Sequence, residues 1–315
     1  MSRTIFVPLD GSRFSEFALS RALTLAGGDG GRIHLATVVA PLPTEPGTEG
    51  ESSPVPAADR TKSLEAGQTY LEEVSQRVRL RADGAEVTSE ALPPGNIVGS
   101  LRRAIQDVDP DLLVMTTHGR GVLERVWLGS VADGLIRRVQ RPILLVRPPE
   151  EAEVGEERPD PKPAVPFQRI LVPLDGSRAS TEILEPVGEL AKDSGASVVL
   201  FRVVPSLSAG AYPYMTLPAR EESTPTVVVK SAEEEMESLA EALRAKGVKV
   251  EVEVRILNHP AVAILQRSEK ADVDLVAMTT RGRGGVARLV LGSVADKVIR
   301  ATDLPLLVHR SDEEA

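Results

Sequence analysis

The sequence predicts an α/β protein made of two repeated, open, parallel five-stranded sheets with helices on both faces. The first observation is a duplication: "IFVPLDGSR" at 5–13 returns as "ILVPLDGSR" at 170–178, and the stretch at 129–148 that begins "GSVAD" returns at 292–311. Second, short apolar runs alternate with amphipathic segments within each copy, which indicates strands joined by helices in a parallel sheet. Third, several of these runs are apolar throughout, as is typical of strands that are covered on both faces.

The elements of the first copy are expected as alternating strands and helices. Runs rich in β-branched and apolar residues predict strands, and apolar residues at helical spacing predict helices, the first of which ends at a glycine pair. In chain order they are a strand at 4–9, a helix at 12–27, a strand at 32–39, a helix at 57–84, a strand at 85–92, a helix at 96–106, a strand at 111–117, a helix at 130–139 and a strand at 142–147. The second copy repeats this order, with strands at 169–174, 197–204, 248–256, 273–280 and 305–310.

The chain length fits two domains. The 315 residues suffice for two domains of ordinary size, and the repeats place them at 1–148 and 167–315. Residues 149–166 between them are acidic, rich in proline and poor in large apolar side chains. Such a segment buries too little apolar surface to offset the entropy of ordering it, so we expect a solvated, semi-stiff linker.

Composition excludes several classes of function. Hydrophobic residues make up 42% and charged residues 26% of the chain, as in an ordinary globular protein. The net charge of −9 argues against binding of DNA or RNA, which requires a basic surface, but it allows a small phosphate ligand. The absence of cysteine excludes disulfides and thiol chemistry, and the four histidines lack metal-ligand spacing. Because the sequence shows neither a signal peptide nor an apolar run of about 20 residues, we expect a cytoplasmic protein without membrane contact.

The expected binding site lies at one edge of each sheet. Ligands of open α/β sheets bind at the carboxyl ends of the strands, so the loops after the first and fourth strands are the candidates. These loops are "DGS" and a stretch that reads "TTHGRGVLERVWLGS" at 116–130 and "TTRGRGGVARLVLGS" at 279–293. Glycines let the backbone approach a ligand closely, and the helix that follows begins with free N–H groups that attract phosphate. The structural alternative for "GSVAD" is a capping box, with Ser130 as the helix cap and Asp133 three residues later.

Two further residue pairs have two interpretations each. Asp10 and Asp175 end the first strand of each copy, where they could contact a ligand or only stabilise an Asp-Gly-Ser turn that caps the next helix. Arg120 and Arg283 occur in both glycine loops, where they could neutralise phosphates or point into solvent.

At these motifs the chain resembles the universal stress protein family in its tandem two-domain form, over nearly the whole chain apart from the linker. The nucleotide-binding signature of that family is G-x2-G-x9-G-[S/T]. Its last three fixed positions are present in both copies, as Gly119, Gly129 and Ser130 and as Gly282, Gly292 and Ser293. Thr116 and Thr279 stand where the signature has its first glycine. A threonine there could narrow the pocket or contact a phosphate through its hydroxyl.

The resemblance implies a set of nucleotide-binding residues in each half. The aspartate lies in the pocket, the valine of the second strand lies near the adenine, and the Gly-Ser-Val that opens the last helix lines the phosphates. With the two loop arginines added, the set in the first half is Pro8, Asp10, Val38, Met115, Thr116, Gly119, Arg120, Gly129, Ser130 and Val131. The set in the second half is Pro173, Asp175, Val203, Met278, Thr279, Gly282, Arg283, Gly292, Ser293 and Val294.

The resemblance also implies a function. It is that of a cytoplasmic sensor or stabiliser in the stress response that binds ATP, ADP or AMP, with Mg²⁺ able to bridge the phosphates. A nucleotide-free interaction scaffold and a slow ATP hydrolase are the alternatives, and no catalytic residue or metal ligand is assigned because no general base stands out. Members of the family often pair along the last strand, so we expect the two halves to form an internal pseudo-dimer. A homodimer and an unidentified protein partner are further options.

Overall fold

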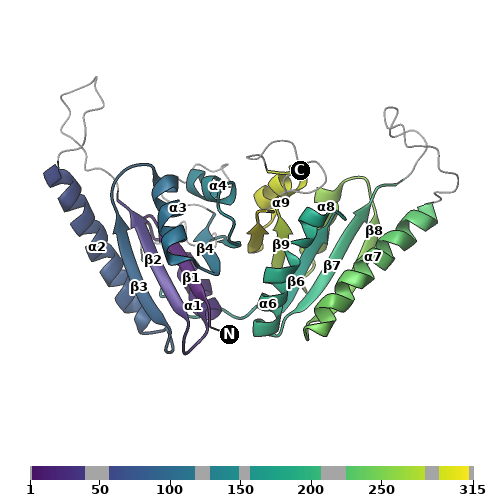
Figure 1. Cartoon of the computed structure of the whole chain (residues 1–315), viewed down its shortest axis with the longest axis horizontal. Helices are drawn as coiled ribbons and strands as arrows, with labels where there is room; N and C mark the ends of the chain where they lie inside the picture. The colour runs from purple at the N-terminus through teal and green to yellow at the C-terminus, as the bar shows by residue number, and fades with distance from the viewer. Residues whose placement is uncertain are drawn as a thin grey trace, which may run out of the picture. The chain divides into compact units, whose positions relative to one another are not determined.

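The structure, a computed structural model, describes residues 2–39, 57–117, 128–148, 157–206, 225–280 and 291–311. The chain divides into two compact units, Met1–Val165 and Pro166–Ala315, and Figure 1 labels most of their helices and strands. Each unit contains its own parallel sheet with accompanying helices, so the predicted duplicated α/β class is confirmed.

Unit 1 has five strands in the order β3-β2-β1-β4-β5, and each pair is parallel. Its elements are β1 (Thr4–Leu9), the short 3₁₀-helix η1 (Ser15–Phe17), α1 (Ala18–Ala26), β2 (Arg32–Val38), α2 (Ala57–Arg79), β3 (Glu86–Leu92), α3 (Ile97–Val108), β4 (Leu112–Thr116), α4 (Ser130–Ile136) and β5 (Ile143–Val146). Consecutive residues are buried along β1, β4 and β5, which shows that both faces of the sheet are covered.

Unit 2 repeats the arrangement with the order β8-β7-β6-β9-β10. Its elements are β6 (Arg169–Leu174), α5 (Arg178–Thr181), α6 (Leu184–Ser194), β7 (Ser197–Val204), α7 (Pro225–Ala245), β8 (Lys249–Ile256), α8 (Pro260–Ser268), β9 (Leu275–Thr279), α9 (Ser293–Ala301) and β10 (Leu306–His309). Phe167 and Phe201 are among its fully buried side chains, as Phe6 and Leu113 are in unit 1.

The segment after β1 differs from the single helix expected at 12–27. It begins as a turn, continues as η1 and becomes α-helical only at Ala18. The Ser15 hydroxyl donates to the Ser12 carbonyl (2.9 Å), and the Ser15 N–H donates to the Ser12 hydroxyl (3.3 Å). Short hydroxyl side chains that bond to nearby backbone groups favour a turn over a helix, which delays the start of α1.

The second half of the predicted linker also differs from expectation. Residues 157–165, called the linker strap below, belong to unit 1 and lie against two of its helices. The Ala164 N–H donates to the Ser20 carbonyl of α1 (3.1 Å), and Pro161 is buried. The prediction of a solvated linker rests on the small number of large apolar side chains in this segment. It misses the docking because hydrogen bonds hold the strap in place. Residues 149–156 lie outside the described part of the chain.

No helix in the described ranges combines the length and the apolar character that crossing a membrane requires.

Candidate functional site

The loops after the first and fourth strands leave each sheet at the same edge. In unit 1 the parallel register places Ile5 beside Leu112, so the ends of β1 and β4 are neighbours. In unit 2 Ile170 lies beside Leu275, and β6 and β9 end together in the same way. The Asp-Gly-Ser turn and the start of the glycine loop therefore lie next to each other in both units, as the fold class predicts.

The glycine loop of each unit is closed by a hydrogen bond across its base, called the neck below. The Gly129 N–H donates to the Thr117 carbonyl, and the Gly292 N–H donates to the Thr280 carbonyl, both at 2.8 Å. The chain thus leaves the fourth strand, makes its loop and returns to the same point. Four predicted site residues, Gly119, Arg120, Gly282 and Arg283, fall within the loops and lie outside the described residues.

The threonines that replace the first signature glycine are part of the core. Thr116 and Thr279 are the last residues of β4 and β9, and they are 6% and 5% exposed. Their side chains therefore fit within the packed sheet instead of extending into solvent. Thr117, the next residue, donates its N–H to the Val146 carbonyl of β5 (3.0 Å).

The helix after each loop begins one residue earlier than the capping-box interpretation assumes. Gly129, not Ser130, is the N-cap of α4, with an extended backbone (φ −63°, ψ 151°) and no side chain to form a cap. The Asp133 N–H donates to the Gly129 carbonyl (2.9 Å), and the Asp133 carboxylate pairs with Arg137 (2.8 Å) instead of reaching back to the cap. The structure therefore excludes the capping-box alternative for Ser130, and Gly292 takes the same place in α9.

Because a glycine takes the cap position in each helix, the hydroxyl groups of the two serines do not serve as helix caps. Ser130 and Ser293 are the first helical residues, where backbone N–H groups lack helical partners, and both serines are exposed. Val131 and Val294 follow them and are half-buried. A Cβ on Gly129 would lie 3.3 Å from the Thr117 carbonyl oxygen, so glycine suits the narrow neck.

The aspartate that ends the first strand forms the turn that the sequence predicts. The Asp10 Oδ1 atom accepts from the Ser12 N–H (2.9 Å) and from the Ser12 hydroxyl (2.6 Å). Asp175 repeats both bonds to Ser177 at the same distances. In unit 2 the serine, not the aspartate, caps the helix, since the Ser180 N–H donates to the Ser177 hydroxyl (3.1 Å). Gly11 and Gly176 have positive φ values of 80° and 78°, which favours glycine in the turn.

The remaining predicted residues line the same edge from within the strands. Val38 and Val203 are half-buried at the ends of β2 and β7. Pro8 and the two methionines are buried, while Pro173 is half-buried. Their backbone lies close to the edge, and their role toward a ligand stays a prediction. The methionines are Met115 and Met278.

Sequence reasoning missed a guanidinium beside the second turn. Arg202 of β7 is 6% exposed, and a Cβ placed on Gly176 would meet its Nη1 and Nη2 atoms at 2.3 Å. The guanidinium therefore packs directly on the glycine of the Asp-Gly-Ser turn. The counterpart in unit 1 is Thr37, because 202 − 37 equals the offset of 165 between the first-strand motifs. Alignment of the two second strands at this offset would have revealed the arginine from the sequence alone.

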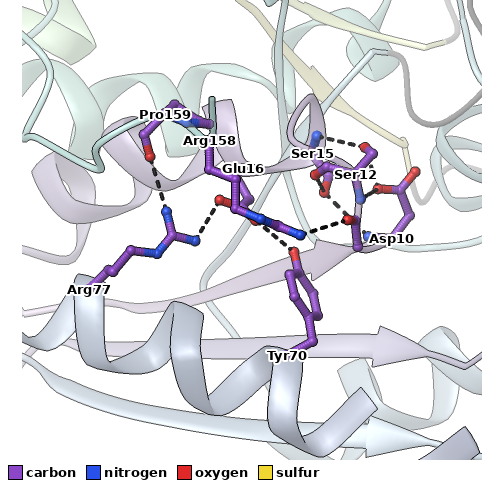
Figure 2. Close-up of polar contacts among 9 residues, drawn as sticks. Asp10, Ser12, Ser15, Glu16, Tyr70, Arg77, Arg158 and Pro159 are labelled. Carbon is purple, nitrogen blue, oxygen red and sulfur yellow. Dashed lines mark hydrogen bonds and ion pairs between the residues drawn. The ribbon is translucent and has the colours of Figure 1, made fainter. Parts of the chain in front are cut away.

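A second missed feature is a polar cluster around Glu16 of η1, which Figure 2 shows. The Glu16 side chain is fully buried, although it carries a carboxylate. It accepts hydrogen bonds from the Tyr70 hydroxyl (3.2 Å), from Arg77 Nη2 (2.6 Å) and from Arg158 Nη1 of the linker strap. The Arg158 guanidinium also lies over the Tyr70 ring, 5.1 Å from its centroid.

The electrostatics of this cluster keep Tyr70 neutral and Arg158 charged. Burial raises the pKa of Tyr70 well above its ordinary value, and the negative charge of Glu16 raises it further. Burial tends to lower the pKa of Arg158, but the charge of Glu16 and the hydrogen bond to it outweigh burial and raise the Arg158 pKa. Tyr70 therefore stays a neutral donor, and the arginine stays a cation beside a buried anion.

The Glu16 cluster belongs to unit 1 alone. The buried residues Leu71 and Val78 of α2 match the buried residues Met236 and Leu243 of α7, which aligns the two helices at an offset of 236 − 71 = 165. At that offset, the counterparts of Glu16, Tyr70 and Arg77 are Thr181, Glu235 and Ala242. The two units thus share their loops but differ in the charges that surround them.

Known proteins are similar to this chain in sequence and in fold. Residues 1–147 and 166–310 match the sequence profile of the universal stress protein family. A universal stress protein of Mycobacterium tuberculosis is 27% identical over 327 aligned residues, which cover 98% of this chain and 96% of that protein. One from Methanocaldococcus jannaschii is 31% identical over 150 residues, or 47% of this chain and 85% of its own length. The crystal structure of a universal stress protein from Archaeoglobus fulgidus has a TM-score of 0.66 at 22% identity, covering 100% of this chain and 98% of its own, so the two share the fold.

Proposed function

Because the chain belongs to the universal stress protein family, we propose that each unit binds one adenine nucleotide (ATP, ADP or AMP) at the carboxyl edge of its sheet. The observation that carries this proposal is the neck of the glycine loop, which is built in the same way in both units, by Gly129 on Thr117 and by Gly292 on Thr280. The neck brings the start of the last helix back beside the end of the fourth strand. There it lies next to the Asp-Gly-Ser turn, so a ligand would be held between the two loops.

The chemistry of this edge suits a phosphate chain. Backbone N–H groups at the start of α9, together with the exposed hydroxyls of Ser130 and Ser293, are hydrogen-bond donors for phosphate oxygens. The absence of a side chain at Gly129 lets the start of the last helix lie close to the Thr117 carbonyl, which keeps the neck narrow. Asp10 and Asp175 would face the nucleotide from the opposite loop.

Magnesium would enter with the nucleotide. Among the described residues, no group of three or more His, Asp or Glu side chains is placed to hold a metal ion. A Mg²⁺ ion at this edge would therefore be bound mainly by phosphate oxygens.

We expect binding rather than turnover to be the function. The site residues offer hydrogen-bond donors and two aspartates, and no general base is assigned among them. Nucleotide binding would favour one conformation of the chain and so act as a cytoplasmic sensor or stabiliser in the stress response. Hydrolysis, if it occurs, would be slow.

We further expect β5 and β10 to pair and to form an internal pseudo-dimer. Each is the outermost strand of its own sheet, with apolar residues throughout β5 and at the first three positions of β10, and such edges are usually paired or covered. Glutamate at both Leu145 and Leu307 should separate the halves and raise the radius of gyration in small-angle X-ray scattering. Circular dichroism must show that the variant is still folded, and an unchanged radius in a folded variant would contradict the pairing.

The decisive experiment is to measure the nucleotide content and affinity of the whole chain. Small molecules released from denatured, freshly purified protein are identified by mass spectrometry, and ATP is titrated with Mg²⁺ by calorimetry. We expect about two nucleotides per chain, because the neck and the turn are present in both units. Asp10→Ala and Asp175→Ala should each remove one site and leave the other.

The outcomes separate the proposed function from its alternatives. If neither bound nor titratable nucleotide is found, Thr116 and Thr279 close the pocket and the scaffold interpretation replaces ours. Glycine at both positions should then restore ATP binding. Phosphate release that disappears in the two aspartate variants would instead indicate a hydrolase.

A further inference from the structure

We propose that the linker strap, residues 157–165, positions the first nucleotide site, with Arg158 as the positioning residue. The choice of ATP as the probe rests on the function proposed above, whereas the docking of the strap does not. The consequence is that ligand binding in unit 1 and docking of the strap are coupled.

The strap is fastened to two helices of unit 1. On α1, the Thr24 hydroxyl donates to the Ala164 carbonyl (2.8 Å), and Arg21 donates to the carbonyl of Val165 (2.5 Å). On α2, Arg77 donates to the Pro159 carbonyl (3.2 Å). Backbone groups of the strap therefore have defined partners on both helices, as a docked segment requires and a solvated linker does not.

Arg158 makes the most demanding contact. Its guanidinium pairs with the carboxylate of Glu16, whose side chain is completely buried, and it covers the ring of Tyr70. A buried carboxylate requires cationic partners, since an unpaired buried charge is strongly unfavourable. Arg77 on α2 supplies one partner, and the strap supplies the other.

The same guanidinium reaches the nucleotide-site turn. The Arg158 Nη2 atom donates to the carbonyl oxygen of Gly11 (3.4 Å), the residue between Asp10 and Ser12 in the sequence. Glu16 follows Ser12 by four residues and lies in η1. Arg158 therefore contacts the segment after β1 at two points, the Gly11 carbonyl and the Glu16 carboxylate. Loss of Arg158 should free the turn that carries Asp10.

The coupling is confined to unit 1. The position of Glu16 is Thr181 in unit 2, and the turn of unit 2 is contacted by Arg202 of its own strand. Linkage requires the effect to be reciprocal: if the strap strengthens binding at the first site, nucleotide at that site must stabilise the docked strap.

The test compares Arg158→Ala with two matched variants of the whole chain. Lys162→Ala removes a cation of the same strap that pairs with Asp160 and not with Glu16. Arg158→Lys keeps the charge and loses the planar, forked donor geometry. ATP affinity is measured at the first site in an Asp175→Ala background and at the second site in an Asp10→Ala background. Hydrogen exchange of residues 10–17 and 157–165 is followed with and without ATP.

We expect Arg158→Ala to weaken ATP binding at the first site by about fivefold or more and to leave the second site unchanged. Lys162→Ala should change neither site, and Arg158→Lys should lie between Arg158→Ala and the wild type. ATP should slow exchange in the strap of the wild type. First-site affinity within about twofold of wild type, or equal weakening at both sites, overturns the proposal.

Hydrogen exchange keeps the two proposals apart. If the wild type binds no ATP, the nucleotide function fails, and exchange in the absence of ATP still decides the strap. Faster exchange of both segments in Arg158→Ala, and not in Lys162→Ala, supports the positioning role. Unchanged exchange in Arg158→Ala refutes it.

Discussion

Replacement of Glu16 by glutamine tests the buried carboxylate that joins η1, α2 and the linker strap in unit 1. The substitution keeps the shape of the side chain and removes its negative charge. Two arginines and one tyrosine then face an amide where they faced a carboxylate. We expect a loss of stability of about 2 kcal/mol, as the balance of three effects shows.

The loss is the larger effect. Each hydrogen bond between charged groups contributes about 1.5–3 kcal/mol, so the bonds from Arg77 and Arg158 together represent about 3–6 kcal/mol. Two effects reduce that figure. Removal of the carboxylate relieves its desolvation, which is several kcal/mol in proteins. The side chains of Arg77 and Arg158 are 31% and 43% exposed, so the guanidiniums can regain water.

Urea denaturation followed by tryptophan fluorescence measures this difference. The chain has one tryptophan, Trp127, which belongs to unit 1 in sequence, so its signal can be assigned to that unit. The matched control is Glu86→Gln, which removes an ion pair with Arg32 whose side chains are 59% and 49% exposed. Surface pairs contribute about 0–1 kcal/mol, so the control should change little. If the two variants lose equal stability, the buried cluster has no special role and our reasoning is wrong.

Two more predictions concern unit 1 and use the same fluorescence signal. Burial, and then the charge of Arg32, lower the pKa of His34 in the folded protein. As the pH falls, His34 therefore takes up a proton in the unfolded chain before it does so in the folded protein. The stability of the fold should thus decrease as the pH drops below about 6.5. His34→Val should flatten that dependence between pH 7.5 and 5.5, and an unchanged slope would show that another group is responsible. A Cβ on Gly134 of α4 would lie 2.7 Å from the Val98 Cγ2 atom of α3, so Gly134→Ala should destabilise by about 1–3 kcal/mol, although alanine normally favours a helix. Gly95→Ala, where a Cβ meets nothing within 4 Å, is the control, and a more stable Gly134→Ala protein would contradict the clash.

The sequence allowed the sheet and its binding edge to be predicted because their signals are local. Runs such as "LLVM" in β4 and "ILLV" in β5 are apolar at every position, which is expected when both faces of the sheet are covered. The repeated motifs added the duplication, and the fold class then placed the Asp-Gly-Ser turn beside the glycine loop. Each step needed only neighbouring residues or a general rule of topology.

The errors and omissions have a different cause. The expected start of α4 at Ser130 agrees with the structure, but the capping-box alternative placed the cap at Ser130, whereas Gly129 holds that position in an extended conformation that composition does not reveal. The strap was taken for solvated linker because Arg158 and Glu16 are 142 positions apart, and no local pattern connects them. Arg202 could have been found, since an arginine within an apolar strand stands out once the copies are aligned.

The charges around the turns show how two copies of one domain have diverged while their loops stayed alike. In each unit a guanidinium touches the glycine of the Asp-Gly-Ser turn, yet it comes from the linker strap in unit 1 and from strand β7 in unit 2. A residue fixed in a strand stays in place as long as the sheet is folded, whereas a residue on a strap can leave when the strap undocks. The proposed first site would therefore depend on a segment that joins the units, whereas the proposed second site would not. This difference gives the duplicated chain a route to unequal sites that a pair of identical domains would lack.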